Sequence, residues 1–103
     1  MASARISKRA QQDLERIRGH IAADNPAAAE RVRDAFLDTA DLLAENREIG
    51  AVILNASPRH ADVRWFVVPR FRNYLIFYRP FQDTILVIRI LHAAQDWTRF
   101  FEK

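Results

Sequence analysis

The chain has 103 residues, half of them hydrophobic and only two of them glycine, so we expect a single domain with one hydrophobic core over residues 1–103. This composition excludes a disordered chain, and apolar runs of about five residues fall far short of the ~20 that a membrane-spanning helix needs. Residues 1–7 lack the apolar segment of a signal peptide and the chain has no cysteine, so we expect a cytoplasmic protein without disulfide or thiolate chemistry.

Charge is distributed unevenly along the chain. Residues 1–48 carry eight basic and nine acidic side chains, whereas residues 49–103 carry eight basic and four acidic ones. Seven of the eight cations in the second part are arginine, which is suited to bidentate contacts with carboxylate or phosphate groups. The second part of the chain therefore fits an acidic partner or a nucleic acid.

A short strand over residues 2–6 and two helices are predicted in the first half of the chain. Ser7 is a good N-cap for a helix over residues 8–23, whose apolar stripe consists of Ala10, Leu14, Ile17 and Ile21. Asn25 and Pro26 then end this helix and begin a second one, which extends no further than Gly50. Because the connection is so short, the two helices are expected to form an antiparallel hairpin.

The second half of the chain has the pattern of a sheet. Residues 51–62 are predicted to form a loop. Three segments rich in β-branched and aromatic residues follow, and they are predicted to form an antiparallel meander over residues 63–68, 74–79 and 84–91. Residues 93–101 favour a short terminal helix. The expected fold class is α+β, with a short N-terminal strand, an antiparallel helix hairpin packed on an antiparallel β-meander, and a short C-terminal helix.

Alternation along the strands predicts that both faces of the sheet are apolar. The last strand is expected to divide into Ile85, Val87, Arg89 and Leu91 on one face and Leu86, Ile88 and Ile90 on the other. Because the hairpin covers only one face, we expect an arginine-rimmed exposed patch that contains Tyr74, Ile76, Tyr78 and Val87. The alternative is that residues 51–62 and the terminal helix cover this second face.

Several segments resemble the ParE branch of the RelE/ParE toxin superfamily. Residues 10–17 are similar to the pattern Ala-x-x-Asp-Leu-x-x-Ile, and residues 21–29 contain a second family pattern around Asp24-Asn25-Pro26. Arg64 and residues 74–79 and 88–96 then follow in the order that the family shows. The resemblance implies the toxin of a type II toxin–antitoxin system, which inhibits DNA gyrase by protein binding and is neutralised by a ParD-like antitoxin whose C-terminal segment wraps the toxin.

Two alternatives to gyrase inhibition remain, because fold alone does not assign function. One is a RelE-type endonuclease that cleaves messenger RNA in the ribosome, and the other is a non-toxic homologue that only binds the antitoxin. RNA cleavage needs a base, an acid and cations, for which the candidates are Arg64, Arg89 and His92. RelE relatives use a late tyrosine, and no tyrosine follows His92, so the resemblance favours gyrase inhibition.

Eight residues are predicted to contact a protein partner: Arg64, Arg70, Arg72, Tyr74, Tyr78, Arg79, Arg89 and Trp97. Several of these residues, and His92, have a structural alternative, whereas Arg70 and Arg72 are expected to be exposed in either case. The tyrosines fit cross-strand packing, Arg64 and Arg89 fit pairing with Asp62 and Asp96, and His92 fits a contact with Asp96 or a cap on the terminal helix.

The aromatic residues at the C-terminus, Trp97, Phe100 and Phe101, are either packing residues or an exposed element that engages gyrase. No metal-ligand spacing, phosphate-binding loop or nucleotide-binding motif is present, so we expect neither a metal nor a cofactor.

Overall fold

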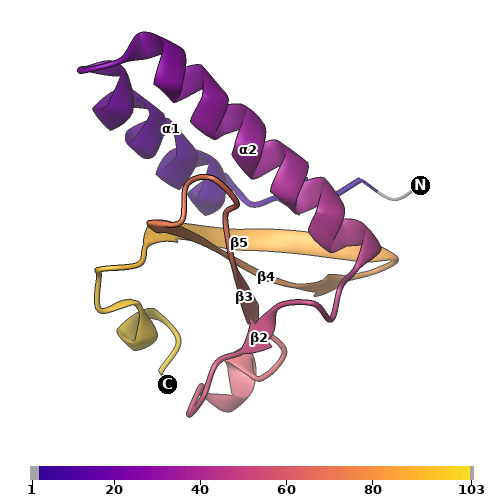
Figure 1. The fold of residues 1–103 in the computed structure, drawn as a ribbon. Helices are drawn as coiled ribbons and strands as arrows, with labels where there is room; N and C mark the ends of the chain where they lie inside the picture. The colour runs from indigo at the N-terminus through magenta and orange to yellow at the C-terminus, as the bar shows by residue number, and fades with distance from the viewer. Residues whose placement is uncertain (1–2, 103) are drawn as a thin grey trace.

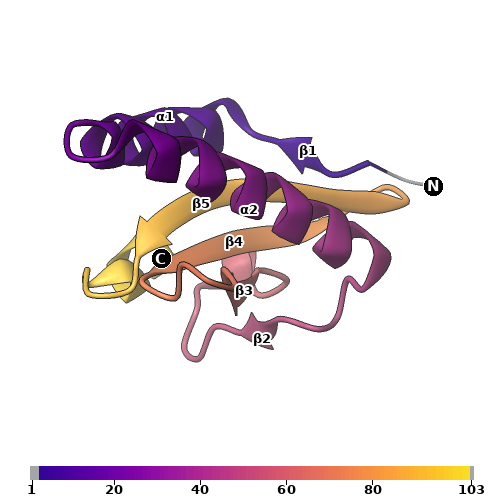
Figure 2. The same ribbon diagram turned by 45° about the horizontal axis from the view of Figure 1, so that its top comes forward.

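The computed structural model describes residues 3–102 and folds them into a five-stranded sheet with two helices on one face (Figure 1). The elements are β1 (Arg5–Ile6), α1 (Lys8–Ala22), α2 (Pro26–Glu45), β2 (Ala51–Val52), β3 (Arg64–Val67), β4 (Tyr74–Phe81) and β5 (Thr84–His92). The strands are ordered β1-β5-β4-β3-β2, and β1 is parallel to β5 whereas the other neighbours are antiparallel. Figure 2 shows β1 beside β5 at the edge of the sheet.

The predicted α+β class, helix hairpin and β-meander are confirmed, and three element boundaries need correction. The predicted loop contains the edge strand β2 and a 3-10 turn, Pro58–His60. Strand β4 continues through Phe81, so the turn before β5 is shorter than predicted. In place of a terminal helix the chain forms one 3-10 turn, Trp97–Phe100. Residue 2, at the start of the predicted first strand, lies outside the described residues.

Polar side chains fix the beginning of both helices. The Ser7 hydroxyl oxygen accepts a hydrogen bond from the Ala10 amide at 3.0 Å, and the Asn25 side-chain oxygen accepts one from the Ala28 amide at 3.1 Å. Pro26 fits the first turn of α2, where the N–H group that proline lacks would have no intrahelical acceptor. The two caps therefore define where the hairpin starts and turns.

A β-bulge interrupts the alternation of β5. Phe77 pairs with Arg89 whereas Tyr78 pairs with Val87, so Ile88 is an extra residue in β5. As a result Ile90 joins Val87 on the helix-covered face. The predicted division of this strand is therefore wrong after Ile88.

The two faces of the sheet carry separate hydrophobic clusters. The larger cluster lies under the hairpin and includes Val32, Phe36, Leu43, Ile76, Tyr78, Val87 and Ile90. The smaller cluster lies on the opposite face and contains Ile53, Val63, Leu75, Phe77, Leu91 and Phe101. Figure 1 shows the loop with its 3-10 turn and the C-terminal turn on this opposite side.

The predicted exposed patch is wrong. Ile76, Tyr78 and Val87 are at most 1% exposed, and Tyr74 packs against the same cluster, because this is the face that the helices cover. The opposite face is the one covered by residues 51–62 and the terminal turn. Tyr78 is therefore a core residue and has no surface for a partner.

The Tyr78 hydroxyl anchors the end of α2 to the sheet. It donates a hydrogen bond to the Arg47 carbonyl at 3.0 Å and accepts one from the Gly50 amide at 2.9 Å. Gly50 has to be glycine because a Cβ there would lie 2.5 Å from the tyrosine hydroxyl and 2.8 Å from the Trp65 carbonyl oxygen. Burial raises the pKa of Tyr78, although the Gly50 amide opposes the shift.

Replacing Tyr78 by phenylalanine should lower the free energy of unfolding by about 1–2 kcal/mol, because the buried Gly50 amide loses its acceptor. Urea denaturation measures this change. Above the ordinary phenol value of 10.0 the unfolded chain releases the Tyr78 proton before the folded chain does, so wild-type stability should fall more steeply with pH than that of Tyr78→Phe. Parallel pH profiles for the two proteins would contradict this assignment.

Candidate functional site

The eight residues predicted to contact a partner do not form one site. They divide among the buried core, two ion pairs, a contact of Arg64 with backbone carbonyls, an exposed turn and two separate hollows in the surface. We define these hollows as the histidine pocket and the aromatic groove.

Arg89 is held inside the fold by the buried carboxylate of Asp13. Its guanidinium donates from Nε to Asp13 Oδ2 at 2.8 Å and from Nη2 to Oδ1 at 3.2 Å, and it lies 4.7 Å from the centre of the Phe100 ring. The Asp13 side chain is completely buried and also accepts the Ile90 amide at 2.9 Å. The predicted pairing of Arg89 with Asp62 or Asp96 is wrong, and Arg89 has only 14% of its side chain exposed.

The Asp13 carboxylate is ionised in spite of its burial. Desolvation by burial raises the pKa of Asp13, but hydrogen bonds from Arg89, the Ile90 amide and Arg16 outweigh it, so the pKa lies below the ordinary value of 3.8. The contacts combine charge-assisted hydrogen bonds with a backbone hydrogen bond, which is the condition under which a buried charge is tolerated. The cluster is a structural element of the fold.

Arg64 and Arg79 also have partners within the chain. Arg64 donates to the Gly50 carbonyl at 2.7 Å and to the Glu48 carbonyl at 3.3 Å, so it fixes the segment after α2. Arg79 pairs with Asp62 at 2.8 Å, and this ion pair, which is partly exposed, lowers the pKa of Asp62. Both arginines are therefore engaged where they lie.

The turn between β3 and β4 presents exposed positive charge. Arg70 and Arg72 are both exposed there. Arg70 has a φ angle of 73°, in the left-handed region that side chains other than glycine rarely adopt. Arg70 also borders Asp34 and Asp38 of α2, which gives this surface mixed charge.

The aromatic groove lies along the free edge strand β2. Its volume is about 650 Å³ and its lining is almost entirely apolar: Ala51, Val52, Ile53, Leu54, Trp65, Trp97 and Thr98. The Trp97 ring lies 5.9 Å from that of Trp65 and 5.2 Å from that of Phe77. Leu54 is 81% exposed and Val52 is 48% exposed, so large apolar side chains face solvent here.

The aromatic C-terminus is a packing element for the most part. Phe101 is 2% exposed and stacks on Phe77 with their ring centres 4.8 Å apart. The Phe101 carbonyl accepts the Ser57 amide at 3.0 Å, which ties the terminal turn to the loop before β3. Among the three aromatic residues of the terminal turn, Trp97 is the one that lines the groove.

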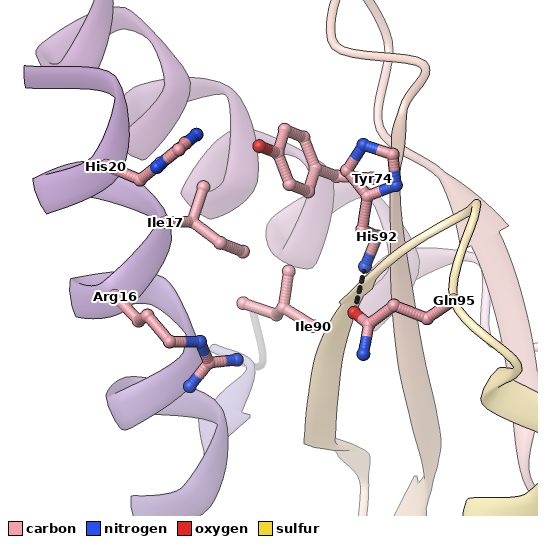
Figure 3. Close-up of a pocket in the computed structure, with 7 residues that line it drawn as sticks. All are labelled: Arg16, Ile17, His20, Tyr74, Ile90, His92 and Gln95. Carbon is pink, nitrogen blue, oxygen red and sulfur yellow. Dashed lines mark hydrogen bonds between the residues drawn. The ribbon is translucent and has the colours of Figure 1, made fainter.

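The histidine pocket lies between α1 and the ends of β4 and β5, and Figure 3 shows its lining: Arg16, Ile17, His20, Tyr74, Ile90, His92 and Gln95. Its volume is about 320 Å³. His92 lies with its ring centre 5.2 Å from that of Tyr74, its amide donates to Gln95 Oε1 at 2.9 Å, and its Nδ1 accepts the Ala94 amide at 3.0 Å. The predicted contact of His92 with Asp96 is wrong, because the hydrogen bonds of His92 involve Gln95 and Ala94, and Asp96 accepts one from Thr98 instead.

The three residues of the endonuclease hypothesis have different partners in different places. Arg64 is on β3 and Arg89 is on β5, so β4 lies between them and their backbones are roughly 10 Å apart. Arg64 binds carbonyls, Arg89 binds Asp13, and His92 caps the turn that follows β5. The structure does not bring them together.

Sequence reasoning missed Asp13, Arg16 and His20. Asp13 lies next to the apolar stripe of α1. A carboxylate that points inward from such a position needs a cationic partner, and this need was the signal in the sequence that could have identified Asp13. Arg16 and His20 are one helical turn apart and flank Ile17, so they share the edge of the buried face. Their proximity to His92 depends on how the hairpin crosses the sheet.

A family model described as the ParE toxin of the type II toxin-antitoxin system parDE matches residues 4–97 of the chain. Toxin RelE3 of Caulobacter vibrioides is 27% identical over 95 residues, which cover 92% of this chain and 98% of that protein. A chain described as the chromosomal ParDE TA system from P. aeruginosa aligns with a TM-score of 0.68 at 22% identity, over 89% of this chain and 96% of that chain.

The helix hairpin on its small sheet is shared with this solved structure. The match to the ParE toxin model covers nearly the whole chain and therefore shows the family. The chain belongs to the ParE toxin family, and it is a toxin of the type II toxin–antitoxin class.

No helix within residues 3–102 is both long and apolar enough to cross a membrane. The same residues contain no group of three or more potential metal-ligating side chains.

Replacing Asp13 by asparagine should lower the free energy of unfolding by about 3 kcal/mol, because Arg89 is left with its charge unpaired in a largely buried position. The matched control is Asp62→Asn, which removes a partly exposed ion pair and should cost less than about 1 kcal/mol. Urea denaturation at neutral pH compares the two variants.

Comparison of the wild type with Asp13→Asn also tests the lowered pKa of Asp13. As the pH falls, the unfolded chain takes up the Asp13 proton near 3.8, before the folded chain does, so this contribution to stability is lost as the pH falls through the lowered pKa. The stability difference between wild type and Asp13→Asn should therefore shrink as the pH falls from 3.8 toward the lowered pKa of the folded chain. A difference that stays constant with pH would show that the charge of Asp13 is not what stabilises the fold.

Proposed function

We propose that this ParE-family toxin inhibits DNA gyrase by binding it and that a ParD-like antitoxin neutralises it. The proposal rests on one contrast: the arginines of the sheet are bound to groups within the chain, whereas the aromatic groove presents apolar surface to solvent. Arg64, Arg79 and Arg89 each bind groups within the chain, whereas Leu54 and Val52 expose apolar surface beside two tryptophans. Such a surface suits a protein partner.

The three residues predicted for the endonuclease alternative, Arg64, Arg89 and His92, do not form the convergent set of groups that RNA cleavage requires. A cation must reach the developing phosphorane charge, and an acid and a base must flank it. Arg89 is bound in a bidentate manner to Asp13, and recruiting it for catalysis would leave that carboxylate buried without its main partner. The relative named Toxin RelE3 keeps an RNA cleavage assay necessary, because its name belongs to the other branch of the superfamily.

The aromatic groove is the surface that we assign to gyrase. It is apolar, it borders an edge strand, and its tryptophans are of the residue type that dominates protein–protein interfaces. We assign the exposed turn with Arg70 and Arg72 to the antitoxin, because two exposed arginines fit acidic side chains on a partner. The two surfaces are chemically distinct, so variants can separate them.

Replacing Leu54 by glutamate should abolish the inhibition of supercoiling by purified gyrase, because a charge in the groove would have to be desolvated on binding. Since Leu54 is 81% exposed, the fold should be unaffected, and the antitoxin should still bind. The matched control is Leu42→Glu on α2, where the leucine is 42% exposed and lies outside the groove.

The supercoiling assay is to be run beside ribosome-dependent cleavage of messenger RNA with the wild-type chain and His92→Ala. Messenger RNA cleaved by the wild type and spared by His92→Ala, with gyrase unaffected, would replace the proposal by the endonuclease alternative. If Leu54→Glu loses antitoxin binding but still inhibits gyrase, the groove belongs to the antitoxin.

Replacing Arg70 by glycine should stabilise the fold and at the same time weaken antitoxin binding. Glycine adopts the φ angle of 73° without strain, so the free energy of unfolding should rise by about 1 kcal/mol. Affinity for the antitoxin should fall, because a cation of the binding surface is lost. The control is Gln82→Gly, which relieves a similar φ angle of 55° in the turn before β5 and should leave antitoxin affinity unchanged. Equal affinities for both variants and the wild type would remove Arg70 from the antitoxin surface.

A further inference from the structure

The histidine pocket is rich in hydrogen-bond donors. Its rim carries the guanidinium of Arg16, the imidazoles of His20 and His92, the Tyr74 hydroxyl and the Gln95 side chain, and its lining contains no carboxylate. Among the residues that the structure describes, neither the His20 ring nor the Tyr74 hydroxyl has a hydrogen-bond partner. The hydrogen bond that Figure 3 draws joins the His92 amide to Gln95 Oε1.

The protonation of His92 adds to this surplus of donors. Because Nδ1 accepts the Ala94 amide at 3.0 Å, the proton of the neutral ring lies on Nε2, which remains a donor. The Gln95 oxygen is occupied by the His92 amide, so the rest of its side chain offers N–H groups alone. The polar half of the pocket therefore offers more donors than acceptors, and an oxygen-rich anion would accept from them.

The ionic cluster in and behind the pocket has a net positive charge. Arg16 donates to Asp13 at 3.0 Å, but that carboxylate is buried and is shared with Arg89, so two cations surround one anion. The Arg16 side chain is 61% exposed, which leaves its remaining N–H groups facing solvent at the pocket rim. The positive charge of this cluster is thus not fully compensated within it.

The floor of the pocket is apolar. Ile17 of α1 and Ile90 of β5 are 7% and 2% exposed, and they lie between the polar groups in Figure 3. A volume of about 320 Å³ is near the lower end of small-molecule sites, which are typically ~300–1,000 Å³. The pocket therefore fits a small ligand with an anionic group and a less polar body.

We propose that the histidine pocket binds a small phosphate monoester of about the size of a nucleoside monophosphate. Donors from α1, β4, β5 and the following turn approach from several directions, which matches the three terminal oxygens of a phosphate better than the two oxygens of a carboxylate. The body of the ligand rests on Ile17 and Ile90 beside the Tyr74 ring. This site is separate from the surfaces assigned to gyrase and the antitoxin.

The test is isothermal titration calorimetry of the full chain with inorganic phosphate, adenosine 5′-monophosphate and adenosine. The monophosphate should bind more tightly than inorganic phosphate, and adenosine should show no measurable binding. His20→Ala and Arg16→Gln should each weaken binding of the monophosphate by about tenfold, the effect of losing one hydrogen bond to a charged group. His20 is exposed and lies on the pocket rim, so His20→Ala should leave the urea denaturation curve unchanged.

Arg9→Gln is the matched control, because Arg9 is an exposed arginine of α1 outside the pocket lining. It removes the same charge as Arg16→Gln and should leave the affinity unchanged. Equal weakening by the two arginine variants would reduce the effect to general electrostatic attraction and overturn the proposal. So would adenosine binding as tightly as the monophosphate, or the absence of binding at millimolar monophosphate. None of these results depends on the gyrase assay.

Discussion

The fold depends on how Asp13 completes the outer edge of β5. Strand β1 pairs with Leu86 and Val87 only, and beyond them the edge would expose backbone groups under a helix, where water is excluded. The Ser7 amide donates to the Val87 carbonyl, and the Ser7 hydroxyl donates to the Ile88 carbonyl. The Asp13 carboxylate then accepts the Ile90 amide, so Ser7 and Asp13 satisfy the backbone groups of β5 that lie beyond the pairing with β1. This fixes α1 against β5 and thereby sets where Arg16 and His20 lie.

The bulge at Ile88 makes this arrangement possible. Without the extra residue, Ile90 would face away from the helices, and Arg89 would take its place among the apolar side chains of the larger cluster. With it, the guanidinium lies at the edge of the sheet, where it reaches Asp13 on one side and the Phe100 ring on the other. The bulge at Ile88 therefore positions both the ion pair of Arg89 with Asp13 and the neighbouring Ile90.

The features that could be predicted from the sequence are those that depend on local chemistry. Ser7 and Asn25 mark the helix starts because their side chains cap nearby amides, and β-branched and aromatic segments mark the strands. Which face of β4 the helices cover could not be predicted, because Tyr74 and Tyr78 alternate with equally apolar Leu75 and Phe77. The bulge and the placement of His20 and His92 around one pocket depend on tertiary packing, which no local sequence pattern predicts.

Arg89 connects the two chemically different surfaces of the toxin. Through Asp13 it holds α1 and hence the polar rim of the histidine pocket, and through Phe100 it contacts the terminal turn that carries Trp97 of the aromatic groove. Loss of toxicity on substitution of Arg89 would therefore arise from disturbed folding even if the residue never touched a target. A role in chemistry or binding can be assigned to it only from a variant whose free energy of unfolding is preserved, whereas Leu54 and His20, both exposed, report on their own surfaces directly.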